Sequence, residues 1–155
     1  MPIVRVQEAD FDIGRELDKL TGARTDAGAL ASFVGLVRDG NDGRGVSAMT
    51  LEHYPGMTEK ALEAICVEAT KRWDILDTLV IHRVGALRPG ERIVLVGVTS
   101  AHRGAAFAAC EFIMDYLKTR APFWKKESTP EGERWVEARA SDDAAASKWL
   151  KGQTP

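Results

Sequence analysis

The stretch that organises this chain runs from Thr99 to Glu127 and reads TSAHRGAAFAACEFIMDYLKTRAPFWKKE. Its middle part predicts an α-helix, because apolar residues recur at helical spacing. The expected buried stripe consists of Phe107, Cys110, Met114 and Leu117. We expect Ser100 to cap this helix, since a serine hydroxyl can accept a hydrogen bond from an N–H group that the first turn leaves unpaired. Pro122 disfavours helical geometry at Ala121, which predicts that the helix ends there or just before it.

Basic side chains lie at both ends of this predicted helix. His102 and Arg103 stand at its start, where unpaired N–H groups and the positive end of the helix dipole suit an anion; a simple capping role is the alternative. Lys118 lies near the other end and shares a face with Glu111 and Asp115, so an ordinary ion pair with Asp115 is its structural alternative. At ~1.5 Å per residue, positions 103 and 118 are roughly 22 Å apart. If both ends belong to one site, we expect two copies of the chain to share it.

The composition bounds the class of protein. The 155 residues fit a single domain, and 45% hydrophobic with 28% charged residues is ordinary for a globular chain. A net charge of −2 gives no general attraction to nucleic acid. The N-terminus lacks a signal-peptide layout and no apolar run is long enough for a membrane span, so no membrane association is expected. Only two cysteines occur, Cys66 and Cys110, which argues against a disulfide framework or a thiolate metal site and predicts a reducing cytoplasm.

The rest of the chain alternates irregularly between strand and helix patterns. Strands are expected over residues 3–6, 29–38, 46–53, 78–84, 92–99 and 134–139. The strand Ala29–Arg38 is mostly apolar, which predicts that it is buried and that it carries Arg38 to its end. Further helices are expected after Asp10 or Asp12, after a capping Thr58, and from Ser141 to about Trp149. This mixture predicts an α+β fold with a mixed or antiparallel sheet and flanking helices.

Several residues could carry chemistry, but composition and spacing leave their roles open. Lysine is a useful nucleophile or proton donor where burial or neighbouring cations lower its pKa, and Lys118 has basic residues near it in sequence. The segment 123–126, FWKK, could bind single-stranded nucleic acid, although a packed tryptophan with extended lysines is the alternative and the chain is acidic. His53 and His82 have no spaced ligand partners and are expected to be structural or surface residues rather than metal ligands.

Six blocks of sequence resemble one known family. They are FVGLVR (33–38), LEHYPGM (51–57), IHRVGALRPGE (81–91), SAHRGAAF (100–107), LKTRAPFWKKE (117–127) and RWVEAR (134–139). In this order they resemble the large, catalytic subunits of molybdopterin synthase, and the resemblance runs from about residue 3 to about residue 150. The alanine-rich tail after Ser141, with residues 143–155 at its end, departs in character from the family.

The resemblance implies a fold, a reaction and partners. The expected fold is a single α+β domain over residues 1–155 with a hammerhead-like subdomain. Two large subunits would form a homodimer flanked by two small ones, in a heterotetramer. The small subunit would be a ubiquitin-like sulfur carrier with a C-terminal thiocarboxylate. The enzyme would be a sulfurtransferase that inserts two sulfur atoms into cyclic pyranopterin monophosphate and so forms the dithiolene of molybdopterin. It would need no metal or dissociable cofactor.

The resemblance also assigns residues to the site. Lys118 matches the family's essential lysine and Lys125 the second one, while His102 and Arg103 match the pair that serves the substrate phosphate from the neighbouring subunit. The other implied substrate-binding residues are Leu36, Val37, Arg38, Lys126, Glu127 and Arg139. Both the carrier tail and the cyclic phosphate are anions, so converging cations suit them. Two other functions remain open: a non-catalytic scaffold that grips the carrier tail, and a binding module for a phosphorylated small molecule.

Overall fold

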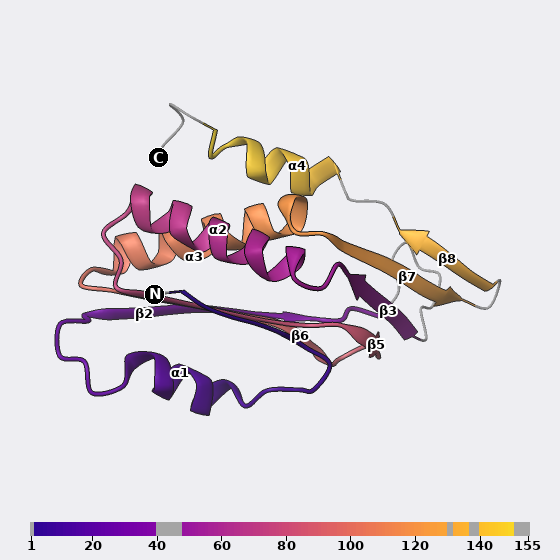
Figure 1. The fold of residues 1–155 in the computed structure, drawn as a ribbon, viewed down its shortest axis with the longest axis horizontal. Helices are drawn as coiled ribbons and strands as arrows, with labels where there is room; N and C mark the ends of the chain where they lie inside the picture. Colours follow the sequence, from indigo (N-terminus) through magenta and orange to yellow (C-terminus); the bar gives the residue numbers. More distant parts are fainter. Residues whose placement is uncertain (1, 40–47, 130–131, 137–139, 151–155) are drawn as a thin grey trace.

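The computed structural model of the chain describes residues 2–39, 48–129, 132–136 and 140–150. Within these residues, the larger sheet has the strand order β1 (Ile3–Gln7), β4 (Asp77–Arg83), β6 (Arg92–Ser100) and β2 (Ala29–Leu36). β1 and β4 are parallel, and the other two pairs are antiparallel. One face carries α1 (Ile13–Thr21), and the other carries α2 (Met57–Arg72) and α3 (Arg103–Arg120), with α4 (Ala140–Ser147) packed on α3 (Figure 1).

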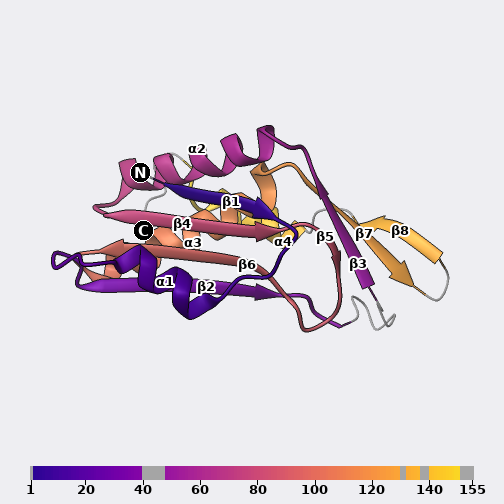
Figure 2. The same ribbon diagram turned by 60° about the horizontal axis from the view of Figure 1, so that its bottom comes forward.

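A second, antiparallel sheet lies at one end of the first (Figure 2). Its strand order is β5 (Gly85–Leu87), β3 (Ala48–His53), β7 (Phe123–Thr129) and β8 (Gly132–Val136). We assign the expected hammerhead-like subdomain to this sheet. The short strand β5, which the sequence pattern did not predict, follows β4 directly, and its first residue, Gly85, has a φ of 88°, a left-handed value that favours glycine. The predicted α+β class with a mixed sheet is confirmed.

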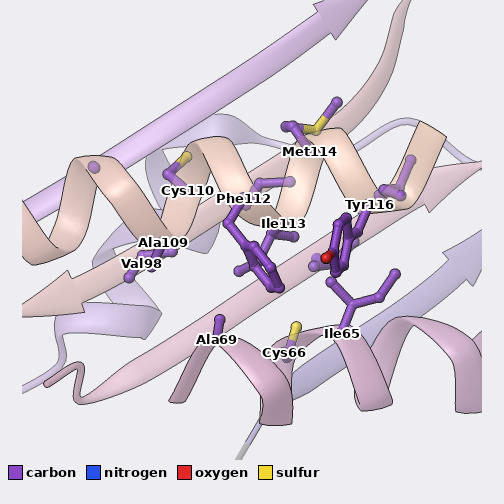
Figure 3. Close-up of a cluster of buried hydrophobic side chains, with 14 of the residues drawn as sticks. Ile65, Cys66, Ala69, Val98, Ala109, Cys110, Phe112, Ile113, Met114 and Tyr116 are labelled. Carbon is purple, nitrogen blue, oxygen red and sulfur yellow. The ribbon is translucent and has the colours of Figure 1, made fainter. Parts of the chain in front are cut away.

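The main core lies between the larger sheet and the pair α2 and α3. Figure 3 shows Phe112 and Tyr116 of α3 pointing toward α2, where Ile65, Cys66 and Ala69 lie. The predicted helix and its end are confirmed, since α3 ends at Arg120, and three of its four predicted stripe residues (Cys110, Met114 and Leu117) are buried. The prediction for Phe107 is wrong, because its side chain is 66% exposed. The fully buried stripe follows Ala109, Ile113 and Phe112, so Phe107 lies on the flank of the helix beyond Cys110.

Two predicted helix caps are also wrong. The N-cap of α3 is His102, whereas the Ser100 hydroxyl donates to the Asp74 carbonyl at 2.8 Å and accepts from the backbone N–H of His102 at 3.2 Å. Ser100 therefore joins the strand end to a loop instead of capping the helix. The N-cap of α2 is Gly56. The Thr58 hydroxyl instead accepts from the backbone N–H of Tyr54 and donates to the Tyr54 carbonyl, in the turn before the helix.

The strand that begins at Ala29 differs from its prediction in burial. β2 ends at Leu36, and only Ala31 within it is buried. β2 is an edge strand with β6 on one side only, so Leu30, Phe33 and Leu36 remain substantially exposed despite their apolar character. The predicted strand end 137–139 lies outside the described residues, and so does the segment 39–45, predicted as a loop, except for its first residue. Among the described helices, none is both long and apolar enough to cross a membrane.

Candidate functional site

The topology brings several basic residues to one end of the larger sheet. In the strand register, Leu36 pairs with Arg92 and His82 pairs with Val94, so β2 and β4 both finish beside the start of β6. α3 leaves the far end of β6 and runs back over the sheet, which returns Lys118 to the end where the second sheet begins (Figure 1). Arg38, His82, Lys118 and the first residues of β7 therefore meet at the junction of the two sheets, which we call the sheet junction.

Lys118 does not form the ion pair that was its structural alternative. The Asp115 carboxylate instead accepts a hydrogen bond from the indole N–H of Trp149 at 2.6 Å, and it lies 3.4 Å from the ammonium of Lys148. Lys118 is exposed, and in the part of the chain that the structure describes it makes no ion pair or side-chain hydrogen bond. Its ammonium is thus available to an anion at the sheet junction.

His82 is a buried histidine beside Lys118. Its side chain is 4% exposed, its Nδ1 lies 2.8 Å from the Arg83 carbonyl oxygen, and its ring stacks on Phe123 with centroids 3.9 Å apart. Burial lowers the pKa of His82 from 6.5 to about 4, and the charges of Lys118 and His53 act in the same direction. The imidazole is therefore neutral near pH 7, and its Nδ1–H donates to the Arg83 carbonyl. The expectation that His82 is structural agrees with this position.

We predict that His82 makes stability depend on pH. Between pH 6.5 and about 4 the unfolded chain binds a proton that the folded chain does not, so stability is complete above pH 6.5 and falls toward pH 4. The loss should reach roughly 3 kcal/mol. His82→Phe keeps a ring against Phe123 and removes the titration, so urea unfolding of this variant should show a weaker pH dependence over that range. Parallel losses in variant and parent would contradict the assignment.

The start of β7 connects His82 to the second lysine. Phe123 and Lys125 project from the same face of β7, because alternate residues of a strand share a face. Phe123 touches His82 and packs against the main core, so that face of β7 is turned toward the sheet junction. Lys125 thus belongs to the same side as Lys118. Lys126, which pairs with Thr50, projects from the opposite face with the half-exposed Trp124. The structure therefore separates two lysines that are adjacent in sequence.

The residues at the end of β2 and just after it differ in the exposure of their side chains. The backbone of Val37 is tied to the turn before β6, since its N–H donates to the Glu91 carbonyl at 2.8 Å and its carbonyl accepts from Gly90 at 2.7 Å. The Val37 side chain is buried in a small cluster, whereas Leu36 and Arg38 are exposed. Arg38 and Leu36 can thus contact a ligand with their side chains. The side chain of Glu127 and all of Arg139 lie outside the described residues.

His102 and Arg103 lie at the opposite end of α3 from Lys118. Both are exposed, and the 18-residue helix separates them from the sheet junction. One chain alone therefore does not bring all the predicted site residues together. Among the described residues, no group of three histidine, cysteine, aspartate or glutamate side chains is arranged to hold a metal ion.

The fold and these cations define the class of protein. It is an α+β protein whose basic residues gather at the junction of two sheets, where they can bind anions. A family model described as "MoaE protein" matches residues 6–120. The molybdopterin synthase catalytic subunit of Ralstonia nicotianae is 65% identical over 149 residues, which cover 96% of this chain and 85% of the relative. The corresponding subunit of Pseudomonas aeruginosa is 62% identical and covers 94% of this chain and 97% of the relative.

Solved structures agree with these sequence matches. The molybdopterin biosynthesis MoaE protein of Burkholderia ambifaria has a TM-score of 0.82 and 57% identity, covering 96% of this chain and 98% of that one. The molybdopterin synthase of Staphylococcus aureus has a TM-score of 0.79 and 28% identity, covering 86% and 96%. The chain belongs to the MoaE protein family, which confirms the resemblance found in the six sequence blocks and, with it, the expected enzyme class.

Proposed function

We propose that the chain is the catalytic subunit of a molybdopterin synthase. It transfers sulfur from the C-terminal thiocarboxylate of a ubiquitin-like small subunit to cyclic pyranopterin monophosphate, twice, and forms a dithiolene. The observation that carries this proposal is the position of Lys118: it lies at the sheet junction, on the side of Lys125, with its neighbouring carboxylate engaged by other groups. The names of the relatives, molybdopterin synthase catalytic subunits at 57–65% identity, support the same function.

The lysine pair supplies the charge that this reaction needs. Opening the cyclic phosphate and replacing an oxygen by sulfur both develop negative charge, which a fixed ammonium stabilises. We assign Lys118 to the reaction centre, as a general acid and base or as an electrostatic stabiliser beside the thiocarboxylate. Lys125 acts next to it on the pterin side, and the two roles can be exchanged. Arg38, at the end of β2, adds a guanidinium that can bind phosphate or carboxylate with two hydrogen bonds.

The second group of cations comes from another copy of the chain in this proposal. His102 and Arg103 flank the N-terminus of α3, where free N–H groups and the helix dipole favour a phosphate. Because one helix length separates them from Lys118, a homodimer in which α3 of each protomer approaches the sheet junction of the other completes two sites. Two small subunits then give a heterotetramer. We also propose one domain over residues 1–155 and a cytoplasmic location, in accord with two buried free thiols.

Reconstitution tests this function directly. The purified chain is incubated with the thiocarboxylated small subunit and cyclic pyranopterin monophosphate, and the dithiolene product is measured. A small subunit that ends in an ordinary carboxylate is the matched control and should give no product. Binding of the small subunit or of the pterin without turnover would instead identify a scaffold or a phosphate-binding module.

A further inference from the structure

The carboxylate of Asp115 lies where it could inactivate the lysine next to it. Asp115 precedes Lys118 by three residues on α3, so their side chains are neighbours on one face of the helix. An acid and a base at this spacing ordinarily attract each other. A pair between them would withdraw the Lys118 ammonium from the anionic reactants. The structure shows Asp115 engaged elsewhere.

The turn that follows α4 holds this carboxylate. The indole Nε1 of Trp149 donates to Asp115 at 2.6 Å, and the ammonium of Lys148 lies 3.4 Å from the same oxygen and 3.1 Å from the Glu111 carboxylate. Partial burial opposes the charged form of Lys148, but its hydrogen bond to Glu111 and the charges of both carboxylates raise its pKa above the ordinary value. A fixed donor and a full positive charge therefore face Asp115.

The donor is held rigidly because Trp149 is part of the core. Its side chain is 1% exposed and meets Trp73 and Phe112 edge-on, at centroid distances of 5.4 Å and 5.7 Å. Its carbonyl oxygen accepts from Arg72 at 2.5 Å and from the hydroxyl of Tyr116 at 3.4 Å. The indole N–H consequently has a fixed direction toward α3.

We propose that Trp149 and Lys148 are positioning residues for Lys118: they withdraw the Asp115 carboxylate and leave the Lys118 ammonium to the anionic reactants. The alanine-rich tail, which departs from the family in character, thereby acquires a role in the reaction. This inference rests on the proposed function of Lys118. Neither residue is required to touch the substrate, because each acts through Asp115.

Other charged groups lie on α3, on α2 and on the strands that meet at the sheet junction. They are Glu111 and Arg120 on α3, Glu68 and Arg72 on α2, Arg38 after β2, His53 on β3, His82 on β4, and Lys125 and Lys126 on β7. Arg72 binds Glu68 at 3.2 Å, and Arg120 lies over the Tyr116 ring at 3.7 Å. Glu111 is held by Lys148 and is two helical turns away from Lys118. Asp115 is thus the carboxylate of α3 whose release would affect Lys118 most.

The test releases Asp115 and then removes its charge. The double variant Trp149→Phe with Lys148→Met keeps an aromatic ring in the core and a side chain of similar length, but it lacks both groups that hold the carboxylate. Adding Asp115→Asn to this background is the matched control. The pH dependence of turnover is measured for each, together with kcat and KM for the pterin. Lys148→Met alone, at a half-exposed position, serves as a second variant whose fold is least disturbed.

In the double variant, the pH profile of kcat should be lowered roughly threefold near pH 7, because the released Asp115 carboxylate pairs with the Lys118 ammonium and withdraws it from the anionic reactants. KM should not change, and Asp115→Asn should restore the parent profile. An unchanged profile, or a loss that Asp115→Asn does not restore, would overturn the inference and leave a purely structural role. Assays of the parent and of Lys118→Ala separate failure of the function from failure of the inference. A parent without turnover, or Lys118→Ala with parental turnover, refutes the proposed role of Lys118 and the inference together. An active parent, an inactive Lys118→Ala and a double variant that behaves like the parent refute the inference alone.

Discussion

Lys118→Ala is expected to lower dithiolene formation by a factor of about a hundred or more while the small subunit still binds. The reason is that in the proposed mechanism Lys118 supplies charge at the reacting atoms, whereas a ubiquitin-like carrier would be held over a much larger surface. Its side chain is exposed at the sheet junction, so its removal should leave the fold intact. Turnover is measured by reconstitution, and carrier binding by titration of the same preparation.

A lysine at a matched position makes the comparison specific. Lys19 lies in the last turn of α1, on the opposite face of the larger sheet, and is also exposed. Lys19→Ala changes the net charge by the same amount at an equivalent place in a helix, so it should leave turnover unaltered. If Lys118→Ala turned over as fast as Lys19→Ala, Lys118 would have no part in the mechanism.

Arg103→Ala is expected to raise the KM for cyclic pyranopterin monophosphate by roughly tenfold to a hundredfold, with a smaller effect on kcat. In the proposed site the guanidinium would make a charge-assisted, two-point contact to the phosphate that persists through the reaction, so its loss should weaken binding more than it slows chemistry. Steady-state kinetics over a wide range of pterin concentration measure both quantities.

The control for this change is Arg15→Ala, which removes an exposed arginine from the first turns of α1. It should leave KM as in the parent. Arg103→Lys, which keeps the charge and loses the fork of donors, should fall between the two. An unaltered dependence on pterin concentration in Arg103→Ala would show that the phosphate binds elsewhere.

Local sequence pattern predicted the elements better than their exposure. The existence of α3 followed from the helical spacing and its C-terminal end from Pro122, and both signals depend on neighbours in sequence. The exposure of Phe107 and of β2 depends instead on which elements lie beside them, and a spacing pattern carries no such information. An apolar strand has the same sequence pattern whether it lies at the centre or at the edge of a sheet.

The candidate site likewise combines residues that the sequence identified with contacts that only the fold reveals. The resemblance to the family named Lys118, Lys125 and Arg103, and the fold then showed which of them share an end of the sheet. The contact of His82 with Phe123 and that of Asp115 with Trp149 join residues more than 30 positions apart. No local signal marks such pairs, so the groups that set the surroundings of Lys118 emerged only from the three-dimensional structure.

In the proposed enzyme, cations from two protomers complete one site, and subunit complementation tests this arrangement most directly. Lys118→Ala and Arg103→Ala chains are co-assembled and assayed at low pterin concentration, with the hybrid fraction measured by native mass spectrometry. A random mixture should recover about one quarter of parental activity, because half of the dimers are hybrids and each hybrid keeps one site with both side chains. Activity no higher than that of the two separate variants, with hybrids present, would contradict a shared site.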